Sequence, residues 1–248
     1  GAGAVVVGGG VLAPERVALL ARSAGLALSV SALGMGVGLL VATVLARFRG
    51  TRWGAARWLV LALAPVPPYV HALAWSSTAF AAGGWLERHG VAAPAFAGAP
   101  AAVWVEAMAL LPLAVGLAMV ALDGVPDELV DAGRLLRSDA ATLARVTLPL
   151  ATPMLLAGAG ILFALALLDY SVPTLFQVNV YAMAIFAEYS VSSDPVAALY
   201  VSLPLVAVAA STIILSQSGL RQAAQRPSHG RPVKPTPARW PVALSALQ

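Results

Sequence analysis

Cysteine is absent from this sequence, which excludes disulfide bonds and thiolate metal sites. Histidine is scarce, and its three copies fall in different segments without the spacing of metal ligands, so we expect no metal site. Charge is scarce as well: 10% of the 248 residues are charged, whereas a soluble domain carries about 25%. With 60% hydrophobic residues, the composition predicts a multi-spanning membrane protein.

Lysine occurs once, at Lys234 in the C-terminal tail. A P-loop needs a lysine in the pattern G-x-x-x-x-G-K-[ST], so the chain cannot hydrolyse ATP by that route. No grouping of serine, histidine and aspartate indicates another catalytic site. The net charge of +4 could indicate nucleic acid binding, but the basic residues lie in short loops between apolar runs. We therefore expect no nucleic acid partner and no enzymatic activity.

Five apolar stretches are long enough to cross a membrane, because a spanning helix needs about 20 residues to cover about 30 Å of hydrocarbon. They are residues 24–46, 58–80, 101–122, 148–168 and 195–215. We therefore predict an all-α membrane protein with about five transmembrane helices, which form a domain over residues 24–216.

Positive charge is concentrated in three segments on one side of this layout. Twelve of the fifteen lysine and arginine residues lie in 47–57, 123–147 and 217–248. The positive-inside rule places these segments in the cytoplasm. Residues 1–23 are then predicted to be an extracytoplasmic edge that follows a span outside this chain. Residues 217–248 form a basic, proline-rich linker whose end resembles the start of a further span, so we expect a piece of a longer protein.

Small residues and prolines mark two of the spans. Gly34 and Gly38 in the first span form a GxxxG pair, which either lets another helix approach closely or reflects the frequency of glycine in membrane helices. The second span contains Pro65, Pro67 and Pro68, which bend or break a helix. A broken helix at membrane depth must be buried in protein or line a cavity.

Polar residues within or beside the spans are candidates for a translocation path. Tyr69 and His71 follow the proline break and line a path or form packing hydrogen bonds. Glu106 lies inside the third span, where a carboxylate marks a partner, an aqueous path or a side chain that reaches the interface. Asp169 either contacts a cationic substrate or caps a helix. It begins the segment 169–194, which is either a re-entrant or interfacial piece or a short helix against the bundle. The candidate path residues are Pro67, Pro68, Tyr69, His71, Glu106 and Asp169.

A polar island between the third and fourth spans, residues 123–149, reads DGVPDELVDAGRLLRSDAATLARVTLP. Its pattern predicts two short amphipathic helices. Pro126 suits the first position of one helix, and Ser138 suits the cap of a second helix over 139–147. The island is either a surface on which a soluble partner acts or an interfacial loop on lipid headgroups. Apolar residues recur at helical spacing at Leu129, Ala132, Leu136, Leu143 and Val146.

The end of the island, DAGRLLRSDAATLARVTLPL, resembles the EAA loop of type I ABC importer permeases. That pattern begins with E-A-A, continues to a glycine and closes with an apolar residue and L-P. Two further segments, PVPPYVHALAW and LLDYSVPTLF, resemble the ferric-iron, aminoethylphosphonate and spermidine-type permeases, and the resemblance extends over residues 21–215. The matching positions are Asp131, Ala132 and Gly133 at E-A-A, Arg137 at the glycine, and Val146, Leu148 and Pro149 at the close.

The resemblance implies a MetI-like permease fold in the bacterial cytoplasmic (inner) membrane, with the EAA helix docked in a cleft of a cytoplasmic ABC ATPase dimer. ATP and magnesium would bind to that partner and not to this chain. A second permease half or subunit, present as a homodimer, heterodimer or tandem fusion, would complete the path. A periplasmic or lipid-anchored substrate-binding protein would deliver substrate to 83–99 and 169–194. The implied coupling residues are Asp131, Ala132, Gly133, Leu136, Arg137, Leu143, Val146 and Pro149.

Arg137 departs from the glycine of the family pattern. In a left-handed turn its side chain would cost about 1–2 kcal/mol. We therefore expect either a turn of another geometry or a permease half that couples less conventionally.

Two other functions fit a membrane protein of this composition. A secondary transporter or channel without an ATPase would favour charged residues paired deep in the spans, where only Glu106 and His71 come near. A membrane scaffold would use the island only to recruit a partner, and the broken second span argues against it. The resemblance favours the permease.

Overall fold

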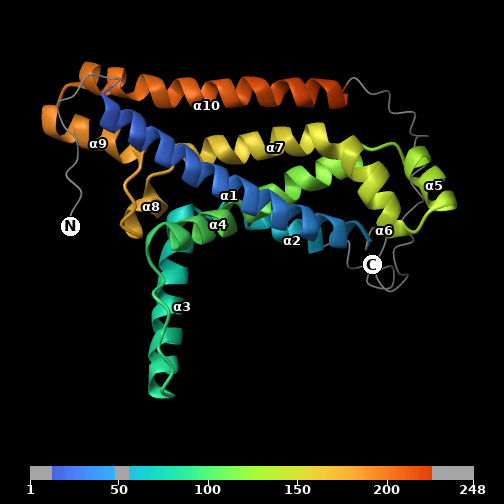
Figure 1. The fold of residues 1–248 in the computed structure, drawn as a ribbon, viewed down its shortest axis with the longest axis horizontal. Coiled ribbons are helices and arrows are strands. Elements are labelled where there is room, and N and C mark those ends of the chain that lie inside the picture. Colours follow the sequence, from blue (N-terminus) through green and yellow to red (C-terminus); the bar gives the residue numbers. More distant parts are fainter. Residues whose placement is uncertain (1–12, 48–55, 225–248) are drawn as a thin grey trace, which may run out of the picture.

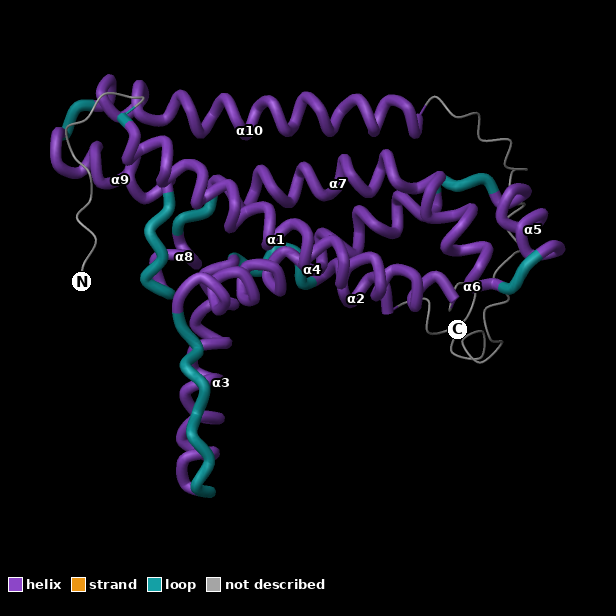
Figure 2. The backbone as a smooth tube through the Cα atoms, in the orientation of Figure 1, coloured by secondary structure: helices purple, strands orange, loops and turns teal. Residues whose placement is uncertain are grey.

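The computed structural model describes residues 13–47 and 56–224, and over these residues it contains helices and no strand (Figure 2). Four helical stretches among them are long and apolar enough to cross a membrane: Pro14–Ala46, Gly98–Asp123, Asp139–Leu168 and Pro195–Gln217. The prediction of an all-α membrane protein is confirmed. The helices are α1 (Pro14–Arg47), α2 (Ala56–Ala62), α3 (Pro68–Arg88), α4 (Gly98–Asp123), α5 (Asp127–Leu136), α6 (Asp139–Thr142), a π-helical segment (Leu143–Thr147), α7 (Leu148–Leu168), α8 (Ser171–Leu175), α9 (Tyr181–Ser192) and α10 (Pro195–Ala224).

The long helices α1, α4, α7 and α10 form a bundle along the long axis of the molecule (Figure 1). Helix α1 packs against α4 and α7, and α10 packs against α7. The buried face of α4 is rich in alanine, and Ala102, Ala107, Ala114 and Ala118 are completely buried. Small side chains let the helix backbones come close, which favours van der Waals packing within a membrane.

The predicted second span, 58–80, is broken at the proline cluster as expected, and neither of its two helices is among the four long apolar stretches. Helix α2 ends at Ala62, and α3 begins at Pro68 after a short turn. The physical reason is the proline cluster, because proline has no amide hydrogen and forces extended backbone on the residue before it. Pro67, which caps α3, is extended with φ −60° and ψ 142°. Helix α3 then runs crosswise to the bundle (Figure 1).

The predicted cytoplasmic segments begin at one end of the bundle. The C-terminal ends of α1 and α10 lie there, and so do α5 and α6 (Figure 1). Helix α10 continues past the predicted end at residue 215 to Ala224, and α1 starts at Pro14, ahead of the predicted residue 24. The predictions for most of the basic loop (48–55), for the tail (225–248) and for residues 1–12 lie outside the described residues.

Helices α8 and α9 lie at the opposite end of the bundle. Of the alternatives for residues 169–194, the structure favours short helices packed against the bundle. Two short helices form there, and α9 packs against α10 and α1. The Tyr181 amide donates a hydrogen bond to Ser23 Oγ at 2.8 Å, and the Tyr181 hydroxyl donates one to the Val201 carbonyl at 2.9 Å. Burial raises the pKa of Tyr181 above its ordinary value by more than the nearby Arg16 guanidinium lowers it. The phenol therefore keeps its proton and remains a donor.

Candidate functional site

Helix α5 is fixed to the end of the bundle through one face. Val125 in the preceding turn and Val130 on α5 pack against Ala121 of α4 and Ala151 of α7. Pro126 stands just before the helix as its cap and not at the predicted first helical position. Two acids occupy the first turn, where they interact favourably with the positive end of the helix dipole.

The other face of α5 exposes apolar side chains, and α5 lies at the end of the molecule (Figure 1). Leu135 and Leu136 are 87% and 84% exposed, and Leu129 and Ala132 are exposed beside them. Burying a leucine stabilises by about 1.5–3 kcal/mol, so an exposed pair at a helix end favours contact with a partner. The predicted docking residues include Leu136 but miss Leu135, because a strict helical repeat through Leu129, Ala132 and Leu136 selects only one stripe.

The turn between α5 and α6 has no left-handed residue. Arg137 lies there with φ −149° and ψ 164°, an extended conformation that any residue adopts. Of the two geometries expected for Arg137, the structure has the unstrained one. Ser138 caps α6 as predicted, and its Oγ accepts a hydrogen bond from the Ala141 amide at 3.4 Å.

The second predicted helix, 139–147, is divided into α6 and the π-helical segment Leu143–Thr147, which continue without a break into α7. Pro149 explains the π segment, because in an α-helix its ring would press on the carbonyl of residue 145. The wider π turn relieves that contact and keeps the helix intact. Residues 139–168 therefore form one rod that connects the loop to a span.

Gly133 is the point at which α5 packs against this rod. A Cβ atom added there would lie 2.7 Å from Thr142 Cγ2 and 3.4 Å from Val146 Cγ2. Thr142 is 1% exposed, and its hydroxyl has no hydrogen-bond partner among the described residues. The family pattern has alanine at this position, and here the Thr142 side chain occupies the space of that methyl group.

Gly133→Ala is therefore expected to destabilise the contact between α5 and the rod by about 1–3 kcal/mol. The β-branched Thr142 side chain has few rotamers with which it can move away on a helix. Amide hydrogen exchange over 127–136 should become faster. Thr142→Ser removes Cγ2 and should recover part of the loss, whereas Gly84→Ala on α3, where a Cβ meets open space, is the control. Equal behaviour of Gly133→Ala and Gly84→Ala would contradict the assignment.

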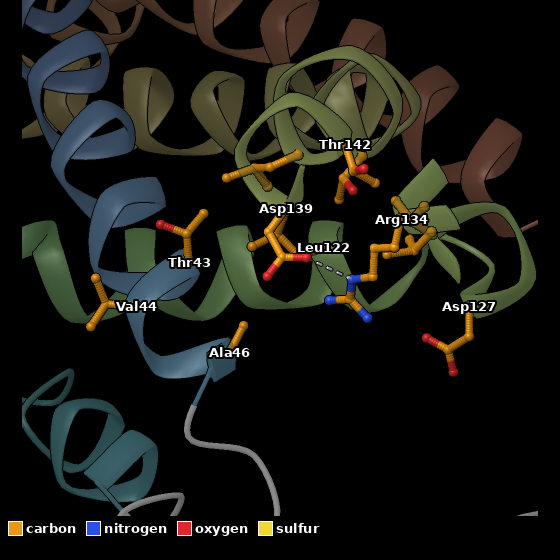
Figure 3. A pocket seen from close by; sticks show the side chains of 12 residues that line it. Thr43, Val44, Ala46, Leu122, Asp127, Arg134, Asp139 and Thr142 are labelled. Carbon is orange, nitrogen blue, oxygen red and sulfur yellow. Dashed lines mark ion pairs between the residues drawn. The ribbon is translucent and has the colours of Figure 1, made fainter. Parts of the chain in front are cut away.

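A cavity of about 730 Å³ lies between α5, α6 and the adjoining ends of α1 and α4 (Figure 3). Arg134 joins the two short helices beside it, with Nε 3.4 Å from Asp139 Oδ1 and Nη1 3.3 Å from Asp131 Oδ1. Both pairs are more than half exposed, so each contributes at most about 1 kcal/mol to the stability of the folded chain. The shape of the loop depends mainly on packing at Gly133 and Val130.

The predicted path residues lie toward the other end of the bundle. Asp169 caps α8: its Oδ1 accepts from the Ser171 amide at 2.9 Å and its Oδ2 from the Val172 amide at 3.3 Å, which favours the capping interpretation. Pro67 and Pro68 open α3, and Tyr69 behind them is 48% exposed.

Glu106 is 1% exposed and lies within the packed core of the chain. Neither of its oxygens has a hydrogen-bond partner among the described residues, and the same holds for Nε2 of His71. This burial favours the partner and path interpretations of Glu106 over the interfacial one.

Comparison with known proteins identifies the architecture. No protein-family model matches the sequence, and neither does any curated protein. Among solved structures, a chain of the MetNI methionine ABC transporter, in an inward-facing conformation, matches over 86% of this chain and 98% of that one. The TM-score is 0.61 and the sequence identity 17%. The chain has the fold of a MetI-type ABC permease. The predicted MetI-like fold class is confirmed, and with its four apolar helices the chain is a multi-pass membrane protein.

Proposed function

We propose that this chain is the transmembrane permease subunit, or one half of the permease, of an ABC importer in the bacterial cytoplasmic membrane. The observation that carries the proposal is the exposed apolar end of α5, which is fixed at the end of a MetI-type helical bundle. The sequence resemblance points to the ferric-iron, aminoethylphosphonate and spermidine-type permeases as its nearest subgroup.

The loop is built to transmit movement. A partner that grips Leu135 and Leu136 moves α5, and α5 contacts the rod 139–168 through Gly133, Thr142 and Val146. Because the rod is one continuous helix, displacement at the loop reaches the middle of the bundle. A cytoplasmic ATPase dimer that binds ATP and magnesium is the proposed partner, and its closure alternates access to the path.

The remaining partners follow from the same proposal. A second permease half faces this one across the path, and a substrate-binding protein delivers ligand at the end of the bundle that carries α8 and α9. His71 and Glu106 are the proposed polar groups of this half, because each has a buried atom with no hydrogen-bond partner among the described residues. An unpaired buried polar group is costly and marks a functional site in a membrane helix.

Leu136→Asp and Asp131→Arg are expected to abolish ATP-dependent uptake and the retention of the ATPase, with membrane insertion intact. Leu136→Asp places on the exposed apolar end of α5 a charge that must be desolvated in the docked complex, at a cost of several kcal/mol. Asp131→Arg reverses the charge at that position and places a second cation beside Arg134. Uptake into proteoliposomes and ATPase retained on the purified protein are the measurements. Val191→Asp, at an exposed apolar position on α9, is the control for ATPase retention. Undiminished uptake without an associated ATPase would contradict the proposal and favour a secondary transporter.

A further inference from the structure

The two arginines at the C-terminal end of α5 differ in what they contact. Arg134 lies in ion pairs with Asp131 and Asp139. Arg137 is exposed and has no acid within ion-pair distance in residues 13–47 and 56–224. The described chain thus neutralises Arg134 and leaves the positive charge of Arg137 without a counterion.

Arg137 stands directly beside the exposed apolar pair of α5. Leu136 is the last residue of the helix, and Arg137 follows it in extended backbone. This extended backbone is unstrained, so Arg137 occupies its position without the cost of a left-handed turn. Two leucines and one uncompensated guanidinium are therefore exposed at consecutive positions 135–137, at the end of a helix that lies at the end of the bundle (Figure 1).

We propose that Arg137 is a specificity-determining residue for the ATPase partner. Leu135 and Leu136 enter an apolar groove of the ATPase, and Arg137 pairs with a carboxylate at the rim of that groove. The planar guanidinium binds a carboxylate through two parallel hydrogen bonds, which fixes orientation as well as charge. This inference rests on the proposed function, and it adds the chemistry by which the partner is recognised.

A protein carboxylate fits this surface better than an anionic lipid headgroup does. The loop also carries Asp127, Glu128, Asp131 and Asp139, and its acids outnumber its three arginines. A negatively charged membrane surface would repel that excess, because surface charges of like sign interact unfavourably within a Debye length. A single carboxylate at the rim of a protein groove interacts with Arg137 and does not face the acids of the loop.

The test uses the full-length protein in phosphatidylcholine nanodiscs and the purified ATPase subunit that supports its uptake. Arg137→Glu is expected to weaken their affinity by about tenfold or more, and Arg137→Lys by less, because lysine keeps the charge without the fork. The affinity of the unchanged protein should fall with added salt, and Arg137→Gln should reduce that dependence. Arg88→Glu, at the exposed end of α3, is the charge-matched control and should bind normally.

The outcomes separate this inference from the proposed function. Loss of binding in Leu136→Asp together with normal binding in Arg137→Glu would overturn the role of Arg137 and leave the permease assignment standing. An effect of Arg137→Glu that occurs only in nanodiscs with anionic lipid would assign the arginine to headgroups and also overturn it. Normal binding in both variants would contradict the permease assignment itself. Correct insertion of each variant is checked by size-exclusion chromatography.

Discussion

Gly38→Ala is expected to disrupt the contact between α1 and α4, whereas the same change at Gly34 or Gly36 leaves it intact. A Cβ atom at Gly38 would lie 2.8 Å from Ala114 Cβ, 2.9 Å from the Ala114 carbonyl carbon and 3.1 Å from the Val115 amide nitrogen. Two of these three atoms belong to the backbone of α4, so no rotamer change relieves the clash. The helices must separate, and we expect a loss of about 3 kcal/mol, at the upper end of the usual cost of overpacking.

The neighbouring glycines of α1 supply matched controls. A Cβ at Gly34 would lie 3.7 Å from the Ala107 carbonyl oxygen, which is ordinary van der Waals contact, and at Gly36 it would meet nothing within 4 Å. Gly36→Ala should stabilise α1 by about 0.5–1 kcal/mol, because alanine is the better helix former. The measurement is the free energy of unfolding in detergent micelles. Equal stability of Gly38→Ala and Gly36→Ala would contradict the close approach of α1 and α4.

Ala114→Gly offers a second test of the same contact. It removes the 2.8 Å contact of the new Cβ with Ala114 Cβ and leaves the two backbone contacts in place. The double variant Gly38→Ala, Ala114→Gly should therefore recover only part of the lost stability. Full recovery would show that the new Cβ clashes only with the Ala114 side chain and not with the backbone of α4.

The sequence predicts the features that depend on single residues or short spacings. Apolar length locates the four spans, and the proline cluster locates a break. Ser138 as a helix cap is predicted by its position before a helical repeat. These predictions succeed because hydropathy, missing amide donors and local capping act within a few residues.

The features that sequence reasoning misses depend on which helices meet. GxxxG spacing cannot tell that Gly38 approaches a backbone and Gly34 does not, because the partner α4 is far along the chain. The proline cluster indicates a break but not that α3 leaves the bundle crosswise. The conformation of Arg137 is undetermined by a pattern that allows two turn geometries. Among the implied coupling residues, Gly133 acts through Thr142, which no local signal marks.

The pairing of Arg16 with Glu188 is a further contact that no spacing predicts. Within the predicted extracytoplasmic edge, residues 1–23, α1 begins at Pro14 and places Arg16 in the packed structure. Arg16 Nη2 lies 2.9 Å from Glu188 Oε2, and the side chains are 5% and 13% exposed. The pair joins α1 to α9 at the end of the bundle opposite α5 and α6 (Figure 1).

Removing one member of this pair is expected to destabilise the protein far more than removing both. Arg16→Met or Glu188→Gln leaves the other partner buried without its counterpart, which typically costs about 3–5 kcal/mol. The double variant Arg16→Met, Glu188→Leu removes both charges, and it should be nearly as stable as the unchanged protein because a buried pair gains little over apolar packing. Asp131→Asn, in a pair more than half exposed, is the control and should cost at most about 1 kcal/mol.

The same variants show whether the pair stabilises only α9 or the whole bundle. Within residues 13–47 and 56–224 the buried pair is the only ion pair between α1 and α9, so its loss should first release α9. Hydrogen exchange over 181–192 should accelerate in Glu188→Gln before exchange in α4 or α7 changes. Single variants no less stable than Asp131→Asn would show that water reaches the pair and that its burial contributes nothing. Uniform acceleration along the whole bundle would show that α9 is part of the cooperative core, and that the end of the molecule that carries α8 and α9 cannot move independently of the bundle.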